Sequence, residues 1–108
     1  MVIDPLREEQ VDELLRALAD ATRRDILRRC ALDSPSVSQL AEAYSMSFPA
    51  VHKHVAVMQR AGLITKERRG REQLVRTDVE MVRRVRHALD DLESAWRGRV
   101  ERMSDLLT

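Results

Sequence analysis

Cysteine is almost absent from this sequence, since Cys30 is the only one among 108 residues. A disulfide within one chain is therefore excluded, and so is a metal cluster built from several thiolates of the same chain. We expect Cys30 to be a small buried apolar residue, because free cysteine most often is. The sequence assigns it no other role.

Long apolar runs are also missing, because Arg or Asp recurs throughout the chain. Nothing approaches the roughly 18 apolar residues of a membrane span, so no membrane partner is expected. The opening stretch, MVIDPLREEQVDELL, carries acids where a secretory signal carries basic residues. We therefore expect a soluble, cytoplasmic protein. At 44% hydrophobic residues, residues 1–108 are enough for one compact domain and too few for two.

The net charge of +1 is unevenly distributed along the chain. Residues 1–33 hold six Arg against eight acids, residues 34–77 hold seven Lys or Arg against three acids, and residues 78–108 hold six Arg against seven acids. A basic middle between mildly acidic flanks suits an anionic partner, of which nucleic acid is the obvious one. A solvated surface can carry the same charge, so this signal is weak alone.

Four short helices are predicted over about 11–18, 20–32, 36–44 and 47–61. Asp20, Ser36 and Ser47 are good N-caps, and Gln39 completes a capping box with Ser36. Gly62 is the expected left-handed residue after the fourth helix. The positions expected to face the core are Val11, Leu14, Leu15 and Leu18; Ile26, Leu27 and Cys30; Val37, Leu40 and Ala41; and Val51, Val55 and Met58. The third and fourth helices, joined by a short turn, predict a helix-turn-helix.

After Gly62, the stretch LITKERRGREQLVRT has two strand-like arms and a charged tip around Gly70. This pattern predicts a β-hairpin. A helix-turn-helix followed at once by a hairpin with a basic tip is the winged-helix arrangement.

A long amphipathic helix is predicted over residues 78–107, with Asp78 as its N-cap. Its apolar stripe is Val82, Val85, Leu89, Leu92, Trp96, Met103 and Leu106, with Arg99 in one slot. So long a stripe exceeds what a small domain can cover, which predicts that part of it packs on a second copy, with Trp96 as an anchor. The alternative is a helix folded wholly back on its own domain.

Three runs together carry a family resemblance: LLRALADATRRDIL, SVSQLAEAYSMSFPAVHKHVAVMQRAGLI and KERRGREQLVRT. They resemble the ArsR/SmtB family of winged-helix repressors from about Leu14 to the end. The resemblance implies a mainly α fold with a small β-hairpin, in the order α-α-α-α-β-β-α. It also implies a homodimer joined through the first and last helices, here through Leu14, Leu89, Leu92, Trp96 and Met103, that binds inverted repeats in double-stranded DNA.

The fourth helix is the expected recognition helix, because N-terminal turns reach base edges in the major groove. Ser47 caps it, Val51 and Val55 point inward, and His52 and Lys53 are therefore turned outward. His54 lies between the faces and either contacts phosphate or packs between helices. His52 and His54 fail as a metal pair, because residues two apart diverge by about 200° on a helix.

Three residues depart from the family pattern. Phe48 stands where the family usually has a polar residue, His52 where it usually has Ser or Thr, and Ser45 where it usually has Gly. Phe48 either contacts a thymine methyl or packs against the helix start. Ser45 predicts a tighter or left-handed turn.

The hairpin tip carries Arg68, Arg69 and Arg71 around Gly70, and Lys66 lies on the first arm. We expect these side chains to follow phosphates or enter the minor groove. An ordinary solubilising loop would have the same residues.

The family's metal ligands are incomplete in this sequence. SVSQLA has no sulfur at the thiolate motif, and His87 has Asp90, Asp91 and Glu93 nearby but no second His. We expect no metal and no cofactor, so the effector is undefined and the chain resembles the metal-independent branch of the family.

The sequence therefore predicts a DNA-binding transcriptional regulator, a homodimeric repressor with an inverted-repeat operator. A winged-helix module that binds proteins is the alternative. An enzyme is not expected, because no local spacing forms a nucleophile, base and orienting group.

Overall fold

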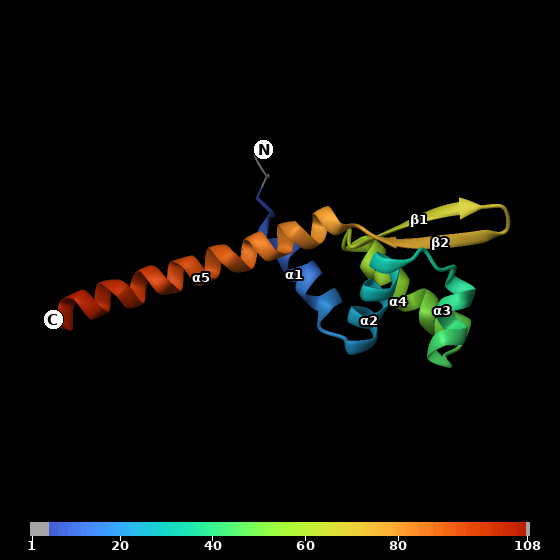
Figure 1. The fold of residues 1–108 in the computed structure, drawn as a ribbon, viewed down its shortest axis with the longest axis horizontal. Helices are drawn as coiled ribbons and strands as arrows, with labels where there is room; N and C mark the ends of the chain where they lie inside the picture. The colour runs from blue at the N-terminus through green and yellow to red at the C-terminus, as the bar shows by residue number, and fades with distance from the viewer. Residues whose placement is uncertain (1–4, 108) are drawn as a thin grey trace.

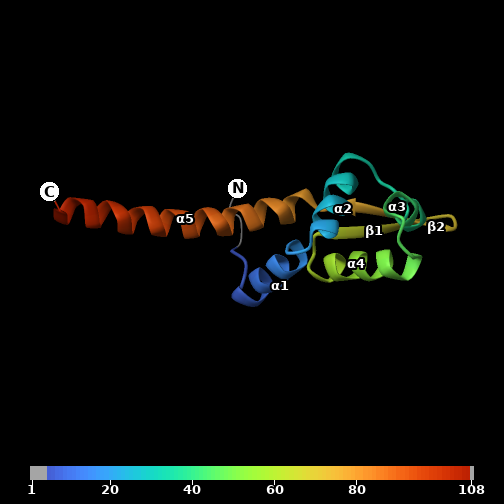
Figure 2. The same ribbon diagram turned by 90° about the horizontal axis from the view of Figure 1, so that it is seen from below.

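The computed structural model describes residues 5–107 (Figures 1 and 2). Its elements are α1 (Glu8–Leu18), α2 (Ala21–Leu32), α3 (Val37–Tyr44), α4 (Phe48–Arg60), β1 (Ile64–Arg69), β2 (Glu72–Thr77) and α5 (Val79–Leu107). This is the predicted winged helix-turn-helix order. In both views α5 runs away from the other elements, which gather around its first turns. No helix within residues 5–107 is both long and apolar enough to cross a membrane.

The predicted helix caps are confirmed. The Asp20 carboxylate accepts from the Arg23 amide at 3.0 Å, and the Ser47 hydroxyl accepts from the Ala50 amide at 3.3 Å. Ser36 and Gln39 form a reciprocal capping box, with distances of 3.1 and 2.8 Å. Each bond satisfies an amide that a helix start leaves without a partner. Local chemistry therefore fixes where α2, α3 and α4 begin.

The core is formed by all four short helices, both strands and the first part of α5. Its fully buried large side chains are Leu14, Ile26, Leu40, Met58, Leu63, Ile64, Val51, Val55 and Val75. Most predicted inward positions are buried, but four corrections are needed, and two of these are Val11 and Leu18, which are only half-buried. Leu15 is 41% exposed, because Leu14 and Ala17 define the inward face of α1. Ala41 is half-buried at the margin of the core.

The hairpin is antiparallel and runs from the Ile64↔Thr77 pair to Arg69↔Glu72, with Gly70 at φ 62° in its turn. The segment between α2 and α3 also pairs with β2. The Val75 amide donates to the Pro35 carbonyl at 2.8 Å, and Ser36 forms an isolated bridge with Leu74. The segment before α3 therefore forms an isolated bridge with β2, which holds the hairpin beside α3.

The apolar stripe of α5 is covered by its own chain only at its start. Val85 is 7% exposed, whereas Leu89 is 49%, Trp96 is 63% and Leu106 is 85% exposed. The helix has 29 residues, about 43 Å at 1.5 Å per residue, and its second half stands clear of the other helices (Figure 1). The α5 helix therefore does not fold wholly back on its own domain.

Ser45 closes α3 in the left-handed conformation, with φ 51° and ψ 36°. It is the only non-glycine residue with positive φ among residues 5–107. The expected left-handed turn is confirmed. A side chain in this conformation clashes with the neighbouring carbonyl, which glycine avoids.

We predict that Ser45→Gly raises the free energy of unfolding by roughly 0.5–1 kcal/mol, because relief of this strain exceeds the entropy that glycine adds to the unfolded chain. Urea unfolding followed by circular dichroism measures the change. Ser45→Ala is the matched control and should give no gain, since alanine keeps the Cβ. An unchanged or lower midpoint for Ser45→Gly contradicts the prediction.

Candidate nucleic-acid interface

The rotation of α4 about its axis is fixed by three buried side chains. Val51, Val55 and Met58 are each 0% exposed. At 100° per residue, His52 and Lys53 then lie on the outer side of the helix, and both are exposed. The structure thus places both predicted reading residues in the first two turns, facing away from the core.

Phe48 and His52 form a stacked pair on one flank of α4. Their ring centroids are 6.2 Å apart and the ring planes differ by 29°. Phe48 is 50% exposed and is not among the residues packed against the core. Ser47, at the N-cap, is exposed just before this pair. One turn of helix therefore presents a polar cap, an aromatic ring and an imidazole together.

His54 lies on the opposite flank of α4, against α2. Its Nδ1 is 3.4 Å from Nη1 of Arg23. The other guanidinium nitrogens of Arg23 donate to carbonyls of the preceding helix, Nε to Ala17 at 2.7 Å and Nη2 to Arg16 at 3.0 Å. His54 is half-buried, unlike His52. Of the two roles considered for His54, this contact favours packing between helices. His52 is exposed beside Phe48 and His54 contacts Arg23 of α2, so the two imidazoles lie on opposite flanks of α4 and do not converge on one metal ion.

The wing, residues 64–77, has two different faces. Residues paired across an antiparallel hairpin share a face. Lys66 pairs with Val75, which is buried, so both side chains lie on the face turned toward the helices. Arg68 shares that face with its partner Gln73. Arg69 lies on the other face, where Glu67 is 3.4 Å from Arg69 Nε and 3.4 Å from Arg76 Nη2. The sequence grouped the wing arginines together, and the register separates them.

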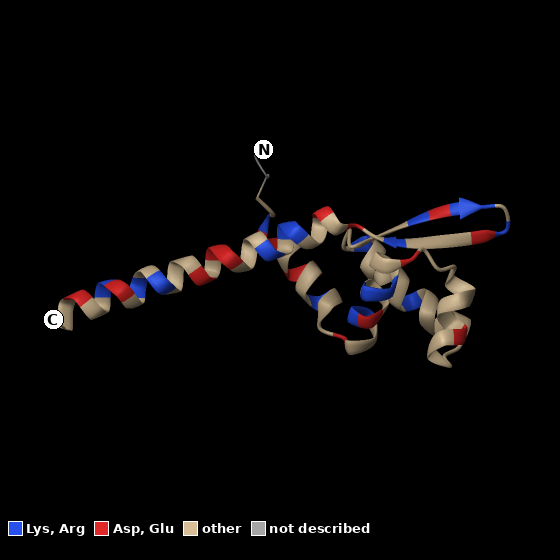
Figure 3. Cartoon of the chain, viewed as in Figure 1, with Lys and Arg blue, Asp and Glu red and all other residues tan. Residues whose placement is uncertain are grey.

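A cleft of about 240 Å³ separates the wing tip from the two helices of the helix-turn-helix. It is lined by Ser36, Val37, Ser38, Phe48, Arg68, Arg71, Glu72 and Gln73. Phe48 contributes an apolar wall, and Arg68 and Arg71 bring positive charge from the wing. Figure 3 shows basic residues at the hairpin turn and along α4. Sequence reasoning missed Ser38 and Gln73, which only the pairing of wing and α3 brings to this cleft.

Comparison with known proteins agrees with this geometry. A family model described as a helix-turn-helix domain matches residues 18–67. The regulator KmtR of Mycobacterium tuberculosis is 38% identical over 85 residues, which cover 76% of this chain and 65% of that protein. The chain thus spans under two thirds of KmtR. The regulator Rv2034 of the same organism is 34% identical over 73% of this chain and 74% of its own length.

An ArsR-like transcriptional regulator from Rhodococcus sp. RHA1 has the same fold. Its TM-score is 0.86 at 26% identity, over 91% of this chain and 90% of that one. The chain belongs to the ArsR/SmtB family of winged helix-turn-helix transcriptional regulators. Members of this family are regulators and not enzymes, as the sequence predicts.

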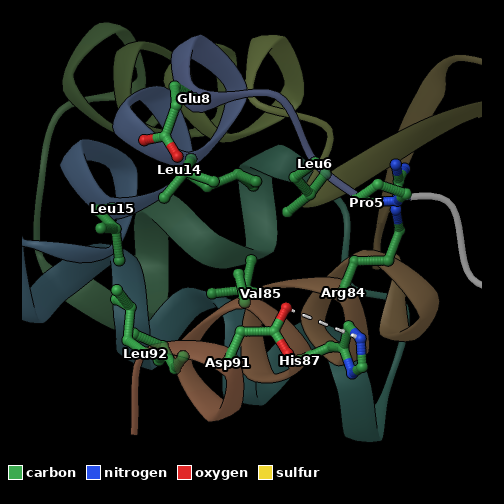
Figure 4. Close-up of a pocket in the computed structure, with 13 residues that line it drawn as sticks. Pro5, Leu6, Glu8, Leu14, Leu15, Arg84, Val85, His87, Asp91 and Leu92 are labelled. Atoms are coloured by element: carbon green, nitrogen blue, oxygen red, sulfur yellow. Dashed lines mark ion pairs between the residues drawn. The ribbon is translucent and has the colours of Figure 1, made fainter. Parts of the chain in front are cut away.

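The first and last helices, on which the dimer contacts are expected from the sequence, enclose a groove of about 250 Å³ (Figure 4). Its apolar lining is Leu6, Val11, Leu14, Leu15, Val85, Ala88, Leu89 and Leu92. Leu14 is 1% exposed, so it belongs to the core and offers a partner little surface. Leu15 is the more exposed α1 residue at the groove.

His87 lies at the same groove and pairs with Asp91, with Nε2 and Oδ2 4.0 Å apart. The family's metal position on the last helix needs further ligands. Within residues 5–107, the structure contains no group of three or more His, Cys, Asp or Glu residues that could hold a metal ion.

Cys30 is 3% exposed in the core, as expected, and burial raises the pKa of its thiol to about 11. A thiolate is the form that binds metals and reacts, so this environment keeps Cys30 in its inert form.

The nearby contact between α2 and α3 is polar. Tyr44 donates to Asp25 and its ring lies 4.9 Å from the Arg29 guanidinium carbon. Burial and this hydrogen bond raise the pKa of Tyr44 to about 12.

Proposed function

We propose that this ArsR/SmtB-family member is a sequence-specific DNA-binding protein, a homodimeric repressor that binds an inverted-repeat operator in the cytoplasm. One observation carries the proposal. His52 and Lys53 face outward on the first turns of α4, beside a wing that presents Arg68 and Arg71 across an open cleft. A helix in the major groove with a basic wing on the adjacent backbone accounts for both surfaces.

The contacts divide by chemistry. His52 and Lys53 reach base edges, and Ser47 and Phe48 lie beside them at the helix start. Arg68, Arg71 and Lys66 bind phosphates from the helix-facing side of the wing, where cations position the protein without reading sequence. Arg69 contributes less, because its guanidinium lies on the other face beside Glu67. His54 keeps α4 in place through Arg23.

The exposed α5 stripe supports a dimer. We propose that residues 1–108, of which 5–107 are described by the structure, belong to one winged helix-turn-helix domain, in which residues 78–107 supply the dimer contacts. Leu89, Leu92, Trp96 and Met103 are each about half or more exposed. A long apolar stripe on a helix that its own chain leaves uncovered is a surface for another chain. Two-fold symmetry of the dimer then matches the two-fold symmetry of an inverted repeat.

The effector is not a metal in this proposal. The third helix carries no thiolate in SVSQLA, the last helix has the single histidine His87, and Cys30 is buried. These features support regulation by another signal or by the abundance of the protein.

We predict that Leu92→Ala combined with Trp96→Ala converts the dimer to monomer and abolishes operator binding, because both changes remove apolar area from the stripe. Sedimentation velocity measures the first effect and fluorescence anisotropy the second. Asp90→Ala with Ser94→Ala, on the opposite side of α5, is the matched control and should leave both unchanged. A wild-type chain that sediments as a monomer at micromolar concentration would exclude the dimer.

We predict that Arg68→Ala or Arg71→Ala weakens binding to operator and scrambled DNA alike. The slope of log K against log salt should fall by roughly 0.9 for each phosphate that the variant no longer neutralises, so by up to about 1.8 in a dimer. Arg69→Ala is the internal comparison, and a smaller change is expected because Glu67 already neutralises it. Equal effects of Arg68→Ala and Arg69→Ala would show that the face of the wing does not matter.

We predict that His52→Ala costs about 1–3 kcal/mol per half-site on the operator and leaves scrambled DNA nearly unaffected, because a hydrogen bond to a base edge is made only on the matching sequence. Anisotropy titrations on both duplexes at three salt concentrations measure this difference. Gln59→Ala, at the far end of α4, is the control.

Two outcomes count against the proposal. Equal losses on both duplexes would relocate base reading away from His52. No preference of the wild type for any duplex, with binding independent of salt, would favour a module that binds proteins.

A further inference from the structure

Phe48 stands out among the exposed residues of the helix-turn-helix and wing. It is the only phenylalanine of the chain. Between residues 33 and 78, all of which the structure describes, it is also the only large apolar side chain that is exposed, at 50%. Within residues 5–107, every other exposed large apolar residue lies on α1, at the end of α2 or on α5. Dimerisation through α5 therefore does not explain Phe48.

A structural role for Phe48 is poorly supported by its contacts. A residue that packs the helix start against the core would be covered by core side chains. Phe48 is 50% exposed, so half of its surface is left uncovered by the domain. Its ring contact is with His52, which is itself exposed. The free half of the ring faces the cleft between the helix-turn-helix and the wing.

The surroundings of the ring point to the chemistry of its partner. Arg68 and Arg71 line the same cleft against one acid, Glu72, and Lys53 is exposed on the same helix, so the surroundings are net basic and suit a polyanionic partner. It must also offer an apolar group to the first turn of α4. In the major groove of B-DNA, the C5 methyl of thymine is the apolar group on the base edges. One partner therefore meets both requirements.

We propose that Phe48 reads the C5 methyl of a thymine in each operator half-site, and that its stacking orients His52 toward an adjacent base pair. This inference rests on the proposed function and makes it more specific. Phe48 determines sequence preference by apolar contact, and His52 does so by hydrogen bonding. The distinction predicts that removal of one thymine methyl group from the DNA lowers affinity only when the Phe48 ring is present.

The test uses the full chain and an operator selected by that chain from a random duplex library. Each thymine of a half-site is replaced in turn, symmetrically in both half-sites, by deoxyuridine, which keeps every hydrogen-bonding group and lacks only the methyl. Replacement at one of these positions should lower wild-type affinity by about fourfold per half-site, or about 15-fold for the two half-sites together. This is the loss expected when one buried methyl-sized group is removed. The other thymines should change affinity less than twofold.

Variants of the protein test whether the effect of the methyl group depends on Phe48. Phe48→Gln should bind the thymine and deoxyuridine duplexes equally at that position, while His52→Ala should keep most of the difference. Phe48→Leu should retain part of it. Because Phe48 lies outside the core, Phe48→Gln should unfold near the wild-type midpoint, which circular dichroism checks.

The possible failures are distinct. If the wild type binds its operator specifically but no deoxyuridine lowers affinity more than twofold, the inference is overturned and the proposed function stands. The same holds if Phe48→Gln is as sensitive to the methyl as the wild type. If the selection yields no preferred duplex, the proposed function fails and the inference fails with it.

Discussion

The burial of one face of α4 is the constraint on which the interface depends. Val51, Val55 and Met58 have no exposed surface, so the helix cannot rotate without bringing a polar side chain into the core. This single orientation sends His52 and Lys53 outward. It also turns Phe48 toward the wing and His54 toward Arg23. Burial of the three apolar residues thus sends the neighbouring polar and aromatic side chains of α4 to three places: solvent, the wing and α2.

The wing is positioned by backbone pairing with the segment before α3 and by side chains at its base, where Ile64 and Val75 are buried in the core. Pro35 and Ser36 pair with β2, and the Thr77 hydroxyl donates to the Leu27 carbonyl at 2.6 Å. A two-stranded hairpin alone is only marginally stable. These bonds make it part of the domain, so the distance between the recognition helix and the wing arginines is fixed by secondary structure. The cleft that contains Phe48 is therefore preformed.

Local signals predicted much of the fold from the sequence, whereas the remaining features depend on tertiary packing. The N-caps at Asp20, Ser36 and Ser47 are encoded within three or four residues of each helix start. Arg23 and His54, by contrast, are 31 positions apart, so no spacing rule indicates that they meet. The division of the wing arginines depends on the hairpin register, which the sequence left open. The sequence therefore named the residues of the candidate site, but not which side of the wing each one occupies.

The distribution of aromatic residues has an optical consequence. Trp96 is the only tryptophan and lies 63% exposed on the part of α5 that its own chain does not cover. Tyr44 is the only tyrosine and lies in the contact between α2 and α3. Indole emission therefore arises from one surface alone. It should shift to shorter wavelength when that surface is covered and respond little to loosening of the helix-turn-helix, so the chain carries its own fluorescent reporter of association, independent of its folding.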